Sequence, residues 1–114
     1  MIDFTVPETL YLMPQFSPGN QALQRLLALI QSSAVFVRDK SAAYLFCNSK
    51  KKVLRIIYWD GQRFIELIYR IDGGVFQWPT TEPKFMEISL FQIERLLRGD
   101  SLNPPLKSSF IFND

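Results

Sequence analysis

The sequence of 114 residues contains no histidine, only one cysteine and no long apolar run. Without histidine the chain cannot form a Ser-His-Asp or Cys-His catalytic group, a histidine-ligated zinc site or a histidine general base. The single cysteine, Cys47, excludes an internal disulfide, and its apolar surroundings predict a buried, unreactive thiol. No run reaches the roughly 18 apolar residues of a membrane-spanning helix. The N-terminus is acidic where a signal peptide is basic. We therefore expect a cytoplasmic protein without membrane contact.

The charges of the chain are nearly balanced, with 13 Lys and Arg against 11 Asp and Glu. A net charge of +2 is too small to indicate nucleic-acid binding by itself, so any such site must come from local clustering. The apolar fraction of 47% is typical of a globular chain. Length and composition predict a single domain over residues 1–114, with a core at about 9–100 and an irregular tail at 101–114.

Apolar residues at helical spacing predict two helices, over residues 20–33 and 90–98. Ser17 suits the start of the first helix, and Ser89 and Gly99 suit the start and end of the second. The predicted buried stripes are Leu23, Leu26, Leu27 and Ile30 in the first helix and Leu90, Ile93, Leu96 and Leu97 in the second.

Strand patterns dominate the middle of the sequence. A short strand at 9–13 is expected to end at Pro14, and residues 85–88 suit another short strand. Between residues 43 and 79, four apolar and aromatic runs are separated by a lysine-rich turn and by two Asp-Gly steps, at 60–61 and 72–73. The predicted fold is α+β: an antiparallel β-meander of about four to five strands with two helices packed on one face.

The Asp-Gly turns also predict a register for the sheet. A two-residue turn at 60–61 places Trp59 opposite Gln62 and Arg55 opposite Glu66, an ion pair that favours this register. Alternation then gives a core face with Leu54, Ile56, Tyr58, Arg63, Ile65, Leu67, Tyr69, Phe76 and Trp78. The opposite, mixed face carries Lys51, Val53, Arg55, Ile57, Trp59, Phe64, Glu66, Ile68, Arg70, Val75 and Gln77.

The aspartates of the two turns are the obvious candidates for metal ligands, but a meander separates them. Asp60 and Asp72 follow successive strands and therefore fall at opposite ends of the sheet, too far apart to share a cation. The sequence also contains no glycine-rich phosphate loop, CxxC pair or acid dyad. We expect no enzymatic activity, no metal and no cofactor.

Basic residues gather at one end of the mixed face. Lys50, Lys51 and Lys52 form the tip of a hairpin, and Arg55 and Arg70 lie nearby on the strands. This cluster is a candidate site for nucleic-acid phosphates. The alternative is that the lysines are simply solvated and deter edge-to-edge aggregation.

The apolar part of the mixed face allows a second interpretation. Ile57, Trp59, Phe64 and Ile68 form a patch that suits a protein partner or self-association. The oligomeric state does not follow from the sequence.

The central segments resemble a known family when taken together. A strand ends in Phe-Cys-Asn before a basic triplet, the next strand ends in Trp-Asp-Gly, an aromatic strand and a Gly-Val-Phe-Gln-Trp-Pro segment follow, and a helix closes the chain. These segments lie at residues 46–52, 54–61, 64–70, 74–79 and 89–99. Over about residues 9–100 the chain resembles the accessory protein called TnpB, the second open reading frame product of bacterial insertion sequences of the sixty-six family.

The resemblance implies a role in transposition beside a separate, larger transposase that carries the chemistry. Contact with that transposase and assistance at the DNA ends are both implied, whereas an adaptor without nucleic-acid contact is the alternative. The chain departs from the family at the first helix, where a Thr-Asp-Met-Arg-Lys-like start is replaced by "SPGNQAL" at residues 17–23. If the family uses those basic residues on DNA, Lys50, Lys51 and Lys52 remain the better candidates here.

Overall fold

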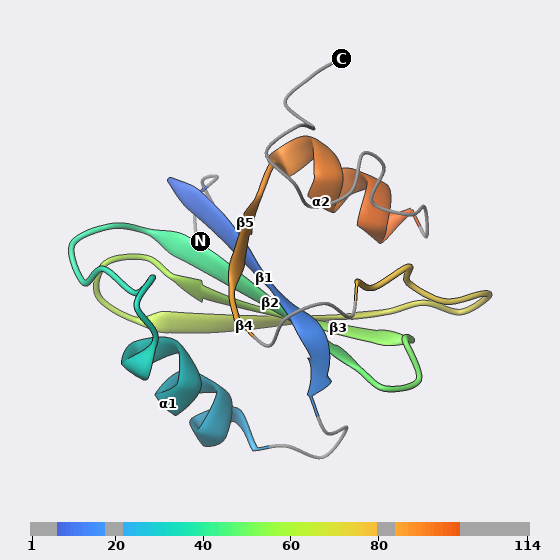
Figure 1. The fold of residues 1–114 in the computed structure, drawn as a ribbon, viewed down its shortest axis with the longest axis horizontal. Helices are drawn as coiled ribbons and strands as arrows, with labels where there is room; N and C mark the ends of the chain where they lie inside the picture. Colours follow the sequence, from blue (N-terminus) through green and yellow to red (C-terminus); the bar gives the residue numbers. More distant parts are fainter. Residues whose placement is uncertain (1–6, 18–21, 80–83, 99–114) are drawn as a thin grey trace.

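A five-stranded sheet forms the centre of the protein, and the computed structural model describes residues 7–17, 22–79 and 84–98 (Figure 1). The elements, in chain order, are β1 (Thr9–Ser17), α1 (Leu23–Ser32), β2 (Ala42–Asn48), β3 (Val53–Trp59), β4 (Phe64–Arg70), β5 (Met86–Ile88) and α2 (Leu90–Leu97). The predicted tail at 101–114 and the predicted helix end at Gly99 lie outside the described residues. No helix in the described ranges is long and apolar enough to span a membrane.

The strand order is β4-β3-β2-β1-β5. β2, β3 and β4 form an antiparallel meander, and β5 pairs antiparallel with β1. β1 runs parallel to β2, and α1 provides the crossover that two parallel neighbours require. The predicted α+β class and the predicted number of strands are therefore confirmed, although the meander itself has three strands rather than four.

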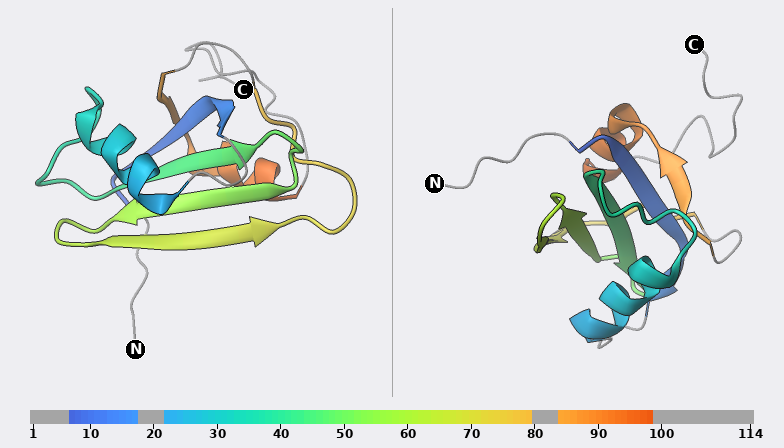
Figure 2. Two further views of the ribbon diagram at one scale, coloured as in Figure 1. Left: turned by 90° about the horizontal axis from the view of Figure 1, so that it is seen from below. Right: turned by 90° about the vertical axis from the view of Figure 1, so that its left-hand side faces the viewer.

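The two helices cover opposite faces of the sheet, which corrects the prediction that both pack on one face (Figures 1 and 2). One cluster lies under α1 and consists of Leu26, Ile30, Met13, Ala42, Tyr44, Phe46, Ile57 and Trp59. The other lies under α2 and consists of Ile93, Leu96, Leu10, Leu12, Ala43, Leu45, Cys47, Leu54, Phe76, Trp78 and Ile88. The central strands are apolar on both faces because each face has its own helix, so strand alternation does not separate a core face from a solvent face here.

β1 continues past Pro14, although proline was expected to end it. The register with β2 is irregular between Leu12 and Phe16, where β1 advances by four residues while β2 advances by two. A bulge of this kind is a usual place for proline in a strand, because no ladder hydrogen bond is required there. Ser17 is consequently the last residue of β1 rather than a helix cap, and α1 begins at Leu23 after Ala22 without a side-chain cap.

The second helix begins as predicted. The Ser89 side chain accepts a hydrogen bond from the Gln92 backbone N–H, and the Gln92 side chain accepts one from Ser89 N. This reciprocal capping box fixes the start of α2. Ile93 and Leu96 are buried as expected, but Leu90 is 44% exposed because it faces away from the sheet.

The β3–β4 hairpin is shifted by two residues from the predicted register. Trp59 pairs with Phe64 and Arg55 pairs with Ile68. A shift of two preserves the alternation, so the predicted sets of side chains within β3 and β4 do share faces. Arg55 still reaches Glu66, now diagonally, with 2.6 Å between Nε and Oε2. The ion pair was predicted correctly, but it does not determine the register.

The chain after β4 does not form the predicted fourth strand of the meander. Residues 71–79 instead turn across the sheet, and Phe76 and Trp78 enter the cluster under α2. Trp78 Nε1 donates a hydrogen bond of 2.8 Å to the backbone oxygen of Met13, within the irregular part of β1. The prediction of a hairpin at Asp72-Gly73 with a fourth meander strand after it is therefore wrong, and burial of the Phe76 and Trp78 side chains holds this segment instead.

Candidate functional site

The turn between β2 and β3 carries the three lysines and has a well-defined geometry. Asn48 Oδ1 accepts hydrogen bonds from the backbone N–H groups of Lys52 and Val53, at 3.0 and 3.1 Å. Lys51 N donates to Asn48 O at 3.0 Å and has a left-handed φ of 61°. Asparagine commonly caps turns in this way, and a left-handed residue allows the chain to reverse tightly. The lysines are thus held on a capped turn.

The segment that follows β4 is attached to this turn. Ile71 N donates to Lys52 O at 3.0 Å and Phe76 N donates to Lys51 O at 2.7 Å. The ammonium group of Lys52 donates to Gly74 O at 2.9 Å. The burial of Phe76 therefore anchors the backbone of the lysine turn as well as its own segment.

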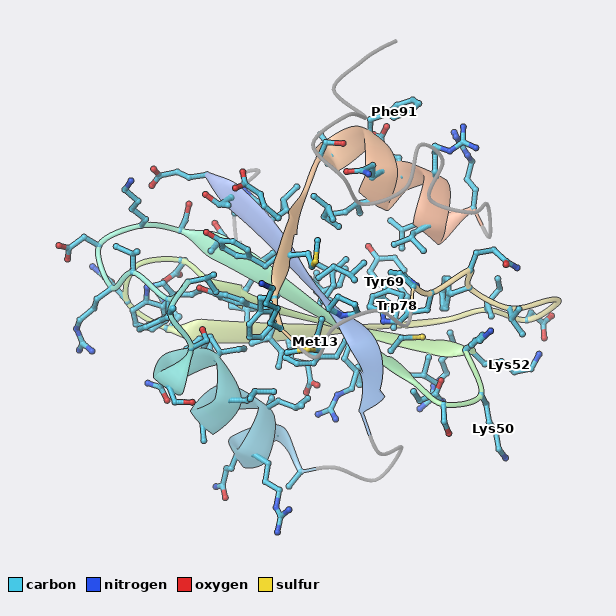
Figure 3. The ribbon with its side chains drawn as sticks, in the orientation of Figure 1. Met13, Lys50, Lys52, Tyr69, Trp78 and Phe91 are labelled. Carbon is cyan, nitrogen blue, oxygen red and sulfur yellow. The ribbon has the colours of Figure 1, made fainter. Side chains whose placement is uncertain are left out.

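Lys50, Lys52 and Arg70 are the exposed members of the predicted basic cluster. Figure 3 shows Lys50 and Lys52 extending outward from one end of the sheet. Arg70 lies at the same end, because it is the last residue of β4 and pairs with Val53, the first of β3. The fold thus brings the cluster together at the end of the sheet opposite Asp60.

The other two basic residues are less available. Lys51 is half-buried in the turn. The side chain of Arg55 is 17% exposed and is held by the ion pair with Glu66. Among the residues that the structure describes, Asp72 is the other acidic residue at this end, immediately after β4. Within the described part of the chain, five cations against these two carboxylates make this end of the sheet positively charged.

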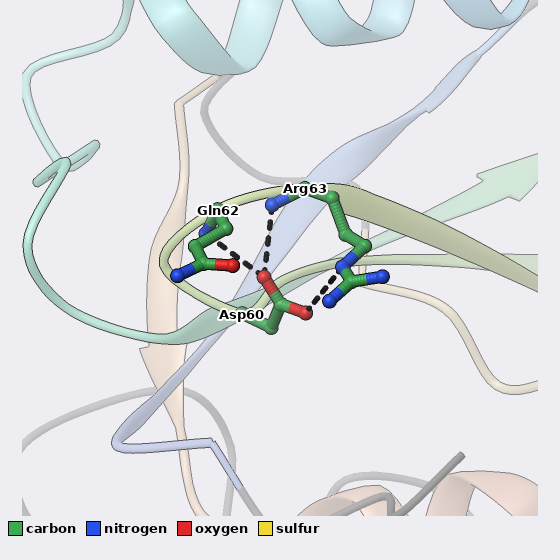
Figure 4. Close-up of polar contacts among 3 residues, drawn as sticks. All are labelled: Asp60, Gln62 and Arg63. Carbon is green, nitrogen blue, oxygen red and sulfur yellow. Dashed lines mark hydrogen bonds and ion pairs between the residues drawn. The ribbon is translucent and has the colours of Figure 1, made fainter. Parts of the chain in front are cut away.

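Asp60 has a structural role at the opposite end of the sheet (Figure 4). Its Oδ1 accepts hydrogen bonds of 2.8 Å from the backbone N–H groups of Gln62 and Arg63, and Oδ2 lies 3.3 Å from Arg63 Nε. The bonds from Arg63 and Gln62 lower the pKa of Asp60 below its usual value. Gly61 has a φ of 100°, which glycine adopts readily. Asp60 therefore caps the turn, and the chain reverses at Gly61 and Gln62 rather than at Asp60 and Gly61.

Asp60 and Asp72 lie at opposite ends of the sheet, as predicted, and are not close enough to share a cation. In residues 7–17, 22–79 and 84–98 no cluster of three acidic or cysteine side chains could hold a metal ion. Cys47 is buried in the cluster under α2, as predicted, and burial raises its pKa to about 12. The thiol therefore stays protonated near neutral pH.

The predicted apolar partner surface does not exist as one exposed patch. Ile57 is fully buried and Trp59 is 6% exposed, because α1 and the loop before β2 cover them. Trp59 Nε1 also donates to the backbone oxygen of Arg38 in that loop. Phe64 is half-buried and stacks on Phe36, whereas Ile68 is 52% exposed. Only Ile68 retains the exposure that the prediction required.

The exposure of β4 on both of its faces was not predicted, because the strand pattern placed Leu67 and Tyr69 on the covered core face. Leu67, Ile68 and Tyr69 are 36%, 52% and 42% exposed, on both faces of the outermost strand. The sequence gives a signal for it in retrospect: Glu66 and Arg70 are charged residues within an otherwise apolar run, and an edge strand tolerates them more easily than a central one.

Comparison with known proteins supplies a family match. The model of the family described as IS66 Orf2 like protein matches residues 8–107. No curated protein and no solved structure matches the chain significantly.

Proposed function

The chain belongs to the IS66 Orf2-like family, and on that basis we propose that it is a non-catalytic accessory protein in the transposition of an insertion element, acting beside the element's transposase. Its contribution in this proposal is to hold DNA phosphates at the basic end of the sheet. The observation that carries the proposal is the capped turn that projects Lys50 and Lys52 from the end where Arg70 also lies.

Two physical features of the turn suit phosphate binding. A lysine ammonium is a point charge with three donors, so the bond from Lys52 to Gly74 leaves two donors for a phosphate. The fixed backbone of the turn limits the entropy lost on binding to the side chains themselves. Contacts of this kind position a protein on DNA without reading its sequence.

Replacing Lys50, Lys51 and Lys52 with alanine is expected to weaken DNA binding and to make it less dependent on salt. Each phosphate contact adds about 0.9 to the slope of log K against log salt concentration, so the variant should lose up to about three times that slope. The measurement is a fluorescence-anisotropy titration with a labelled duplex of about 30 base pairs at roughly 50 and 200 mM salt.

A variant with equal loss of charge provides the control. Arg25, Arg38 and Lys40 are exposed on α1 and on the loop before β2, which are elements separate from the lysine turn, and their replacement by alanine also removes three positive charges. If both variants lose affinity equally, net charge rather than the turn governs binding. If the unchanged protein does not bind the duplex at low salt, the proposal is wrong.

A second candidate function is a protein adaptor that does not touch DNA. The exposed start of α2 favours it, because Leu90 and Phe91 are 44% and 57% exposed, and the Arg95 guanidinium lies 5.8 Å from the centre of the Phe91 ring. For this function, co-expressed transposase should co-purify with the chain, and Phe91→Ala should reduce its recovery severalfold while the lysine variant retains it. Equal recovery by Phe91→Ala and the unchanged chain would contradict this use of α2.

A further inference from the structure

The outer edge of β4 is unpaired among the residues that the structure describes. Two hydrogen bonds between the two sides of the β3–β4 hairpin show which backbone groups of β4 face β3 and which face the outer edge. Asp60 N donates to Arg63 O, and Ile71 N donates to Lys52 O. Hydrogen-bonded and non-hydrogen-bonded pairs alternate along an antiparallel ladder. The odd-numbered residues of β4 therefore bond to β3. The backbone groups of Phe64, Glu66, Ile68 and Arg70 point outward.

An unpaired edge with apolar side chains is a template for another strand. Natural edge strands usually carry lysine, proline or a bulge that prevents such pairing. β4 is regular over its seven residues and contains no lysine or proline. Its charged residues are Glu66 and Arg70, which are opposite in sign and four positions apart.

This spacing makes the edge complementary to itself. When two copies of β4 pair antiparallel about a two-fold axis at Ile68, Glu66 of each copy lies opposite Arg70 of the other. In the same register Leu67 of each copy lies opposite Tyr69 of the other, on the other face. Centring the pair at Glu66 or Arg70 instead places two like charges opposite each other, which is unfavourable. Glu66 can accept both Arg55 and the second copy's Arg70, since a carboxylate has two oxygens.

We propose that two copies of the chain dimerise through β4, antiparallel and centred at Ile68, so that their sheets become continuous. The proposal does not depend on DNA binding, because it rests on the exposed backbone, the apolar side chains and the charges of one strand. The dimer would carry two basic ends, one from each copy, on either side of the two-fold axis.

Ile68→Lys tests the position of the axis. Two lysines would lie opposite each other at the centre of the dimer, and like charges in that position repel each other, so we expect dimerisation to weaken at least about tenfold. Sedimentation equilibrium should give twice the 13.3 kDa of one chain at roughly 100 µM, because a single strand pair is at the weak end of interfaces. Phe91→Lys, which places the same charge at a 57% exposed site on α2, should leave the dimer intact.

Charge reversal tests the register. Arg70→Glu places Glu66 opposite a glutamate, and Glu66→Lys places a lysine opposite Arg70, so each variant alone should be monomeric. Mixed together, the two variants have unlike charges at both positions and should form a heterodimer. Circular dichroism of each variant verifies that it is folded. A monomeric unchanged chain, a dimer indifferent to Ile68→Lys, or a mixture that stays monomeric would overturn the proposal.

Discussion

Ile57→Lys is expected to unfold the protein, whereas Ile68→Lys is expected to leave the stability of one chain almost unchanged. The two isoleucines share one face of the sheet on neighbouring strands. Ile57 is fully buried under α1, and Ile68 is 52% exposed. A buried ammonium without a partner costs about 3–5 kcal/mol, and the lost apolar packing adds to it. That sum approaches the whole stability of a small domain, about 5–15 kcal/mol. An exposed substitution usually costs less than about 0.5 kcal/mol.

Urea unfolding followed by tryptophan fluorescence measures both variants. A protein concentration of roughly 1 µM keeps any contribution from self-association small. Ile57→Leu provides the control for the position, because it preserves the apolar volume and should cost less than about 1.5 kcal/mol. If Ile57→Lys were tolerated as well as Ile68→Lys, α1 would not cover this face, and the apolar patch predicted from the sequence would be restored.

Ile57 and Ile68 show how much of the structure the strand pattern predicts. Alternation places Ile57 and Ile68 on the same face correctly, and it does so even though the predicted register is off by two. Alternation does not predict which part of that face a helix covers. α1 follows β1 and crosses to a parallel neighbour, and that pairing, made between segments far apart in the sequence, brings it over Ile57. The same face appears mixed because its Trp59 end is covered and its Arg70 end is exposed.

The lysine turn was more predictable than the rest of the site. A basic triplet between two strands suffices to place Lys50 and Lys52 at an exposed end of the sheet, because turns lie at the surface. The ion pair of Arg55 with Glu66 could be predicted as well, since the two side chains share a face in both the predicted register and the observed one. The anchoring of the turn through Lys52, Gly74 and Phe76 could not, because it depends on where the chain goes after β4.

The path after β4 depends on one tryptophan that the pattern had assigned to a strand. Pairing of β1 with β2 is interrupted between Leu12 and Phe16, so Met13 lies where the ladder is irregular. A buried backbone carbonyl without a donor costs free energy. Trp78 Nε1 donates to the Met13 oxygen at 2.8 Å, and its ring fills the cluster under α2. Trp78 therefore joins two segments 65 residues apart and compensates for the bulge that Pro14 requires.

Trp78→Ala is accordingly expected to destabilise the protein by about 3–5 kcal/mol, since it removes a large buried side chain, and the unpaired Met13 carbonyl adds to the cost. Trp78→Phe preserves most of the apolar bulk and isolates the hydrogen bond, with an expected cost of about 1–2 kcal/mol. Gln77→Ala is the matched control, because Gln77 is the exposed neighbour in the same segment and should change stability by less than about 0.5 kcal/mol. Urea midpoints followed by far-ultraviolet circular dichroism give all three values. A Trp78→Ala midpoint equal to that of Gln77→Ala would show that the segment after β4 does not depend on Trp78.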